Sequence, residues 1–119
     1  PFSTAFAAAN LGFDKMLLAE EGLYLGHVQV APYASPGSME LAESILPYCR
    51  NNNAVLLANH GAVTWGRDVV QAWHRTQALE QYCKQRYLGL LLGRPIPVLE
   101  PEEVRELTVR RLAGEERRN

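Results

Sequence analysis

The run Ala54–Ala58, with the sequence AVLLA, constrains the fold more than any other segment of the chain. Five apolar residues between Asn53 and Asn59 have the length of a strand that is buried on both faces. A strand of this kind needs an apolar layer on either side. The run therefore predicts a layered domain in which helices pack against a sheet.

Strands and helices alternate along the rest of the sequence, which indicates the α/β class. The predicted strands are 27–30, 54–58 and 62–65, and the predicted helices are 2–9, 14–21, 39–50, 69–92 and 101–113. We expect the third helix to kink or restart at Pro47, because an interior proline removes a hydrogen bond. Two or three strands are too few for a self-sufficient sheet, so we expect a segment outside this sequence to complete it.

Local signals define the ends of several helices. Asp14, Ser38 and Asp68 are suited to cap the helices that follow them, and Gly22 is suited to end the second helix. Apolar residues at three- and four-residue steps predict one core-facing stripe on the longest helix. The stripe comprises Val69, Trp73, Thr76, Leu79, Cys83, Tyr87 and Leu90.

Length, charge and apolar patterning limit the class of protein. The chain has 119 residues, about one small domain, and its 12 Lys and Arg against 13 Asp and Glu argue against a nucleic-acid-binding module. No apolar run approaches the roughly 18–20 residues of a membrane span, and the start has no secretory signal. The sequence opens at Pro1 without a preceding cap or turn, so we expect a fragment. The charged tail 115–119 is expected to fray.

The two cysteines, Cys49 and Cys83, do not form a C-x-x-C pair. This spacing excludes a zinc ribbon and a thioredoxin-type motif. Two isolated cysteines without a secretory signal fit the reducing cytoplasm better than a disulfide scaffold. We expect both to be packed, inert thiols.

His60 is the strongest candidate for a functional residue. It follows the buried strand directly, and functional groups in α/β folds collect at the carboxyl ends of strands. Gly61 behind it allows a backbone turn that can aim the imidazole outward. The alternative is a histidine in a tight connection that only bonds a carbonyl. His27 and His74 are weaker candidates, and no H-x-H or H-x-x-x-H pair sets two histidines to share a metal.

Other polar residues have structural interpretations that we favour. The loop Ser35–Ser38 leads into a helix and could hold an anion, but it lacks the lysine of a P-loop, and a structural cap is the simpler interpretation. Glu80 is expected to be a satisfied or solvated carboxylate rather than a catalytic base. Glu40 and Glu43 are expected on a solvated helix face.

Three segments in order resemble the class II aldolase/adducin family. They are Ala54–Gly61 with the helix through Glu80, the loop Ala31–Ser38, and Pro95–Leu99 with the following Pro-Glu-Glu. The resemblance is to the branch that contains L-fuculose-phosphate aldolase and ribulose-phosphate 4-epimerase. It implies a three-layer α-β-α fold, of which residues 1–119 would be the C-terminal part of a single domain.

The resemblance also implies a metal site. Enzymes of this branch hold Zn²⁺ or another divalent cation through three histidines, two from an H-x-H pair and one from the His-Gly turn, which corresponds to His60. The H-x-H pair, the acid/base glutamate and most of the phosphate-binding loop would lie upstream of Pro1. An imidazole must be neutral to bind a metal, so binding should weaken in acid. One imidazole cannot fill a coordination shell, so the fragment alone should be inactive.

The implied activity is the cleavage of a sugar phosphate to dihydroxyacetone phosphate and an aldehyde, with the metal as Lewis acid. The resemblance also implies a homotetramer with its active site at a subunit interface. Positions that are aromatic in such enzymes correspond to Leu18 and Pro36, which leaves the substrate open. The alternatives are a non-catalytic, adducin-like scaffold and a related epimerase or decarboxylase.

Overall fold

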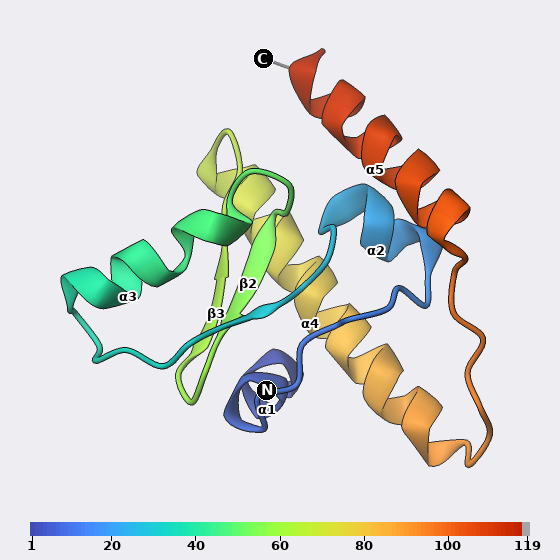
Figure 1. Cartoon of the computed structure of the whole chain (residues 1–119), viewed down its shortest axis with the longest axis horizontal. Coiled ribbons are helices and arrows are strands. Elements are labelled where there is room, and N and C mark those ends of the chain that lie inside the picture. Colours follow the sequence, from blue (N-terminus) through green and yellow to red (C-terminus); the bar gives the residue numbers. More distant parts are fainter. Residues whose placement is uncertain (118–119) are drawn as a thin grey trace.

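The computed structural model describes residues 1–117, and its helices and strands alternate along the chain (Figure 1). The helices are α1 (Phe2–Ala8), α2 (Ala19–Tyr24), α3 (Met39–Ser44), α4 (Val69–Leu91) and α5 (Pro101–Glu116), with a short 3₁₀ helix, η1 (Leu46–Tyr48). The strands are β1 (Val30–Ala31), β2 (Ala54–Leu57) and β3 (Gly61–Thr64). The α/β prediction is confirmed.

Strand β2 lies at the centre of the sheet. It pairs in parallel with β1 and in antiparallel fashion with β3, so that Leu56 lies opposite Val30 on one side and Ala62 on the other. β1 begins later than the predicted strand. The carbonyl of Val28 accepts from Phe13 N–H, and pairing with β2 starts only at Gln29, whose carbonyl accepts from Leu56 N–H at 2.8 Å.

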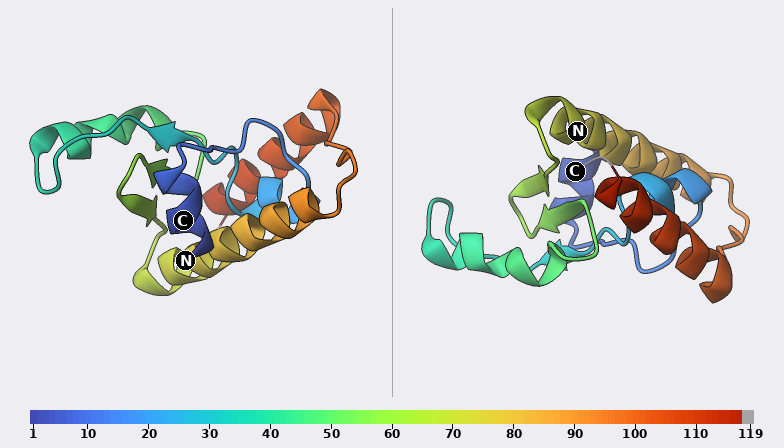
Figure 2. Two further views of the ribbon diagram at one scale, coloured as in Figure 1. Left: turned by 90° about the horizontal axis from the view of Figure 1, so that it is seen from below. Right: turned by 90° about the horizontal axis from the view of Figure 1, so that it is seen from above.

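Alternate residues of β2 feed two separate apolar layers, which explains why the whole strand is buried. Ala54 and Leu56 pack with α1 and α4, whereas Val55 and Leu57 pack toward α3 and η1. Figure 2 shows α3 on one side of the sheet and α1 with α4 on the other. The described part of the chain therefore has the expected three layers.

Helix α2 begins at Ala19 instead of following an Asp14 cap, and Gly22 lies inside it rather than at its end. A Cβ at Gly22 would come 3.0 Å from the Cβ of Leu107 on α5. The glycine is therefore a point of close helix approach, and the prediction that it ends the helix is wrong. The spacing rule could not anticipate this because the contact is made by a residue 85 positions later.

The predicted stripe of α4 is correct only in the middle of the helix. Leu79 and Cys83 are buried, but Val69 and Leu90 are 81% and 67% exposed. The buried face is instead formed by Arg75, Leu79, Tyr82 and Cys83. The sheet and α1 cover only the central turns, so the apolar residues at both ends project beyond them.

Two helix caps follow the sequence prediction. The Ser38 hydroxyl accepts from Leu41 N–H at 3.1 Å, and Asp68 accepts from Gln71 N–H at 2.7 Å. The restart at Pro47 is also confirmed, because α3 ends and η1 forms there.

Two other details differ from the prediction. Cys49 is exposed rather than packed, while Cys83 is buried, and burial raises the pKa of the Cys83 thiol to about 12. Helix α5 continues to Glu116, so Glu115 belongs to it and does not fray. The rest of the predicted tail includes residues 118–119, which lie outside the described residues. Within residues 1–117, no helix is both long and apolar enough to span a bilayer.

Candidate functional site

His60 lies in the tight turn that connects β2 to β3. Its backbone N–H donates to the carbonyl of Leu57 at 3.0 Å, which closes the turn. The residue before it, Asn59, has φ of 56°, in the left-handed region that Asn tolerates better than most residues. Gly61 has no positive φ, and no atom lies within 4 Å of where its Cβ would be. The expectation that Gly61 shapes the turn is therefore wrong, and Asn59 has that role.

The turn is tied to helix α1. Asn59 N–H donates to the carbonyl of Ala7 at 3.1 Å, and its side-chain Nδ2 donates to the carbonyl of Ala8 at 3.4 Å. The position of His60 is thus fixed from two sides, by the β2–β3 hairpin and by the end of α1. The sequence prediction assigned the shape of the turn to Gly61 and not to Asn59, although an Asn directly after an apolar strand is a recognised turn signal.

The side chain of His60 is exposed and does not turn inward into packed hydrocarbon. A rigid turn that presents an exposed imidazole offers one nitrogen to a metal ion. Residues 1–117 contain no cluster of three or more His, Cys, Asp or Glu side chains that could hold one. The described residues therefore do not make a metal site by themselves, because a protein zinc site has three or four ligands.

Glu80, on α4, binds the start of α1. Its carboxylate accepts hydrogen bonds from Phe2 N–H at 2.7 Å, Ser3 N–H at 2.9 Å and the Ser3 hydroxyl at 2.8 Å. Partial burial raises the pKa of Glu80, but the hydrogen bonds from Ser3 and Phe2 favour the carboxylate and hold the pKa below its usual value. The interpretation of Glu80 as a satisfied carboxylate is confirmed.

The remaining candidates do not join His60. His74 is exposed on α4, and His27 is half-buried with its backbone N–H bonded to Asn52. Glu40 and Glu43 are exposed, as expected. In the loop before α3, Ser38 acts as a cap.

The two positions that the resemblance marks as aromatic lie apart from the His60 turn in the sequence. Leu18 is the N-cap residue of α2 and is 37% exposed, and Pro36 is exposed in the loop before α3. Neither lies in the β2–β3 turn.

Comparison with known proteins gives the family. The model of the class II aldolase and adducin N-terminal domain matches residues 1–87, which include α1, the sheet, the His60 turn and most of α4. The chain belongs to the class II aldolase and adducin family. Helix α5 lies beyond the matched range.

Curated relatives include two kinds of enzyme. The chain is 39% identical to 3-oxo-tetronate 4-phosphate decarboxylase of Haemophilus influenzae over 70% of its own length and 39% of the relative's. It is 30% identical to L-fuculose phosphate aldolase of Methanococcus maripaludis over 77% of its length and 49% of the relative's. The chain thus spans about two fifths to half of these relatives.

Solved structures agree with this assignment. YgbL from Escherichia coli, described as a candidate aldolase/epimerase/decarboxylase, superimposes with a TM-score of 0.76 at 28% identity. The match covers 91% of this chain and 53% of that one. An L-fuculose 1-phosphate aldolase gives the same TM-score at 26% identity, over 90% of this chain and 50% of that one. The fold is therefore that of class II aldolases.

Proposed function

We propose that this chain is part of a metal-dependent lyase that cleaves a carbon–carbon bond in a sugar phosphate. The first candidate reaction is the aldol cleavage that yields dihydroxyacetone phosphate and an aldehyde. His60 would supply one ligand to Zn²⁺ or another divalent cation, and the other ligands and the acid/base group would come from residues outside this sequence. The protein would act in the cytoplasm as a homotetramer.

The observation that carries this proposal is the exposed imidazole on a turn fixed by two independent elements, in a chain of this family. A metal ligand must be held in place before the ion binds, and the bonds from Asn59 to α1 supply that rigidity. The exposed imidazole counts against the adducin-like scaffold, because a scaffold needs no metal ligand at this position.

A second candidate reaction is the decarboxylation of a 3-oxo sugar-acid phosphate. It is favoured by the 39% identity to the Haemophilus influenzae decarboxylase, against 30% to the Methanococcus maripaludis aldolase. The two reactions share their chemistry: each breaks a bond to a carbon next to the carbonyl carbon and leaves an enolate. The same site can therefore serve either reaction, and the groups around the leaving fragment decide between them.

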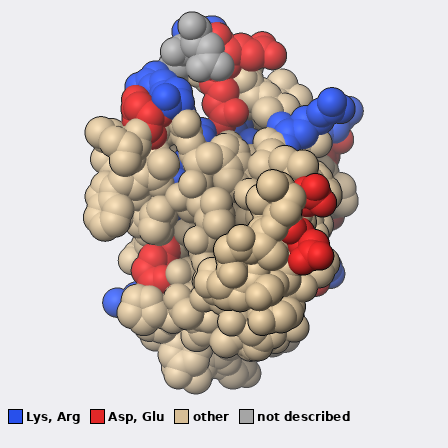
Figure 3. All heavy atoms as spheres, turned by 90° about the vertical axis from the view of Figure 1, so that its left-hand side faces the viewer, with Lys and Arg blue, Asp and Glu red and all other residues tan. Residues whose placement is uncertain are grey.

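The assembly part of the proposal is supported by the surface on the α3 side of the molecule. Figure 3 shows this face with most charged side chains toward its margins. Three exposed large apolar residues belong to this part of the chain. Tyr33, in the loop before α3, is 63% exposed, Met39 in α3 is 73% exposed, and Leu46 in η1 is 65% exposed. Surfaces of this kind are typical of protein–protein contacts.

The test is made on the full protein that contains this chain, with metal content measured by elemental analysis. We expect about one divalent cation per subunit, lost in His60→Ala and kept in His27→Gln. Turnover is assayed with a ketose 1-phosphate, for release of dihydroxyacetone phosphate, and with 3-oxo-tetronate 4-phosphate, for release of CO₂. Full metal content in His60→Ala would refute the ligand assignment. Absence of both metal and turnover in the unsubstituted protein would favour the adducin-like scaffold.

A further inference from the structure

A cavity of about 740 Å³ lies between α2, the first turns of α4 and the end of α5. We name it the three-helix cavity, and its wall includes Tyr24, Arg67, His74, Tyr82, Arg111 and Glu115. Its size is in the usual range for small-molecule sites. The cavity begins just beyond the end of β3 that is opposite the His60 turn, and His60 is not part of its wall.

The wall of the three-helix cavity carries more positive than negative charge. Four guanidinium groups line it, against the carboxylates of Asp68 and Glu115. Arg75 and Arg111 are 9% and 5% exposed, so part of this charge is held away from bulk water. Burial lowers the pKa of Arg111; Glu115 opposes this shift and the nearby Arg75 adds to it. The carboxylate of Glu115 thus lies beside the two buried guanidinium groups of Arg75 and Arg111.

Both carboxylates of the wall are already engaged. Glu115 Oε1 accepts from Arg75 at 2.8 Å and from Asn53 at 2.6 Å. Asp68 accepts from Gln71 N–H and from Arg67 Nε, the latter at the longer distance of 3.3 Å. Three of the four arginines are engaged as well, because Arg75 and Arg111 donate to backbone carbonyls and Arg110 is ion-paired with Glu106. Arg67 bonds Asp68 through Nε alone among the described residues, so its Nη groups are the donors left to face the space.

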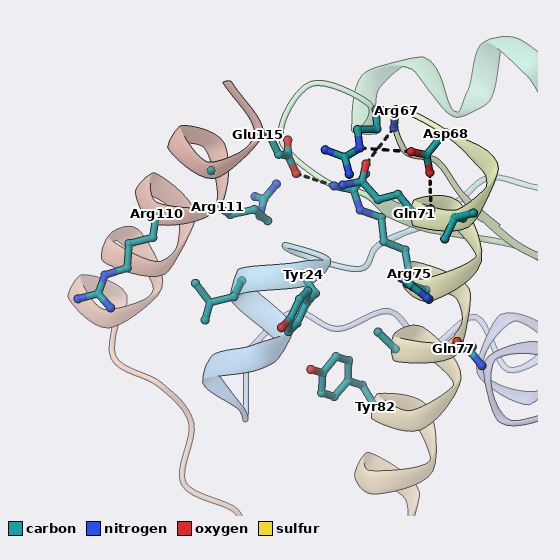
Figure 4. Close-up of a pocket in the computed structure, with 15 residues that line it drawn as sticks. Tyr24, Arg67, Asp68, Gln71, Arg75, Gln77, Tyr82, Arg110, Arg111 and Glu115 are labelled. Atoms are coloured by element: carbon teal, nitrogen blue, oxygen red, sulfur yellow. Dashed lines mark hydrogen bonds and ion pairs between the residues drawn. The ribbon is translucent and has the colours of Figure 1, made fainter. Parts of the chain in front are cut away.

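The donors lie in two groups. Arg67 lies at the head of the cavity, near Glu115 (Figure 4), and its side chain is 49% exposed. Below it, Tyr82 on α4 points toward Tyr24 on α2, and Figure 4 shows no bond from either hydroxyl to the residues drawn. Apolar side chains, Leu23 and Ala78 among them, complete the wall. A cationic part of the wall thus lies next to an aromatic and apolar part.

We propose that the three-helix cavity binds a small organic phosphate that carries a flat ring. The phosphate would lie against Arg67, whose planar guanidinium donates two parallel hydrogen bonds to phosphate oxygens. The ring would lie against Tyr24 and Tyr82, because aromatic faces stack and their area is apolar. Arg75 and Arg111 hold the wall through backbone carbonyls and supply the background charge. This site is separate from that of the proposed reaction.

The test is isothermal titration calorimetry on the full protein with three probes: AMP, adenosine and inorganic phosphate. We expect saturable binding of AMP, weaker binding of phosphate and no saturation with adenosine. Arg67→Gln should weaken AMP binding about tenfold or more, as expected for loss of a charge-assisted hydrogen bond. Tyr24→Ala should weaken AMP binding but leave phosphate binding unchanged.

The matched control is Arg105→Gln. Arg105 is an exposed arginine that is ion-paired on α5, but it does not line the three-helix cavity. We expect this variant and His60→Ala to bind AMP as the unsubstituted protein does. The proposal is overturned if AMP does not saturate, if Arg67→Gln binds it normally, or if Arg105→Gln weakens binding as much as Arg67→Gln. Loss of AMP binding in His60→Ala would assign the phosphate to the His60 site instead, and would overturn it too.

Discussion

At the scale of single residues, two glycines with positive φ offer a matched comparison. Gly26 and Gly37 have φ of 78° and 80°, a conformation that costs an alanine about 1–2 kcal/mol. A Cβ at Gly37 would meet nothing within 4 Å, whereas one at Gly26 would lie 2.9 Å from both Arg111 Nη2 and Asn52 Oδ1. We expect Gly37→Ala to lower the free energy of unfolding only by the cost of the positive φ. Gly26→Ala should lower it by about 2–4 kcal/mol.

The two glycine variants are compared by urea denaturation. The larger loss at Gly26 arises because the added methyl group displaces Arg111 from the carbonyls of Gly22 and Asn51, which hold α5. Amide hydrogen exchange should therefore accelerate in α5 for Gly26→Ala and stay unchanged there for Gly37→Ala. Equal losses in the two variants would show that crowding at Gly26 is relieved without disturbing α5.

A second residue-scale prediction concerns the buried pair of Glu21 and Arg86. Glu21 is 1% exposed and accepts from Leu17 N–H at 3.2 Å and from Arg86 Nη2 at 3.3 Å. Arg86 lies over the Phe13 ring, 4.2 Å from its centroid, and its Nε is buried without a hydrogen-bond partner among the described residues. Arg86→Met would leave a buried carboxylate without its cation, which costs about 3–5 kcal/mol near neutral pH.

The pH dependence of this loss has a definite sign. Burial raises the pKa of Glu21 above 4.5, and Arg86 partly lowers it again. The folded state therefore binds the proton more tightly, so stability falls as pH rises from 4.5 through the folded pKa. Without Arg86 that pKa rises further, and the deficit of Arg86→Met should shrink on acidification. Denaturation at several pH values checks this, and Glu21→Gln combined with Arg86→Met should abolish the effect. A deficit that is constant with pH would contradict it.

At the scale of elements, Glu80 joins α1 to α4. The carboxylate accepts the first N–H groups of α1, which a helix leaves without internal partners. We expect Glu80→Ala to lower the free energy of unfolding by about 1–2 kcal/mol and Glu80→Gln, which keeps an acceptor, by less. Since these hydrogen bonds hold the folded pKa below 4.5, the contribution is complete above pH 4.5 and is lost as the pH falls through the folded pKa. Denaturation at pH 7 and pH 3 would measure it, and an unchanged Glu80→Ala would contradict it.

Elements whose identity depends on local chemistry could be predicted from the sequence. Three features depend only on neighbours within a few positions. They are the buried run of β2, the caps at Ser38 and Asp68, and the break at Pro47. The place of Gly22 inside α2 and the buried face of α4 depend on distant partners. Gly22 meets Leu107 of α5, and the wall around Arg75 is completed by Glu115. Periodicity alone does not contain those contacts.

The candidate site was predictable in the same limited sense. The position of His60 after the central strand marked it, because strand ends gather functional groups. The residue that shapes its turn was assigned wrongly, since Gly61 was favoured for its conformational freedom while Asn59 has the positive φ. The three-helix cavity was not foreseen at all, because its walls come from α2, α4 and α5, which are far apart in the sequence.

At the scale of the whole molecule, apolar groups face solvent at the far end of α4. Leu90, Leu91 and Leu92 are 67%, 64% and 74% exposed, and Leu88 on the same helix is 48% exposed. Apolar clusters of this kind are usually covered by protein. The structural matches to YgbL and to an L-fuculose 1-phosphate aldolase include about nine tenths of this chain. They cover only 53% and 50% of those two proteins. The described residues thus match about half of each of these solved structures.

The last prediction follows from the ligand count. A polypeptide of these 119 residues alone should keep no divalent cation through gel filtration, and its melting temperature should be the same with Zn²⁺ or with EDTA. The full protein should lose stability in EDTA, because a ligand that binds only the native state stabilises it. His60→Ala in the full protein should remove that difference. Stoichiometric zinc on the 119-residue polypeptide would show that residues 1–117 assemble a site that their described geometry does not contain.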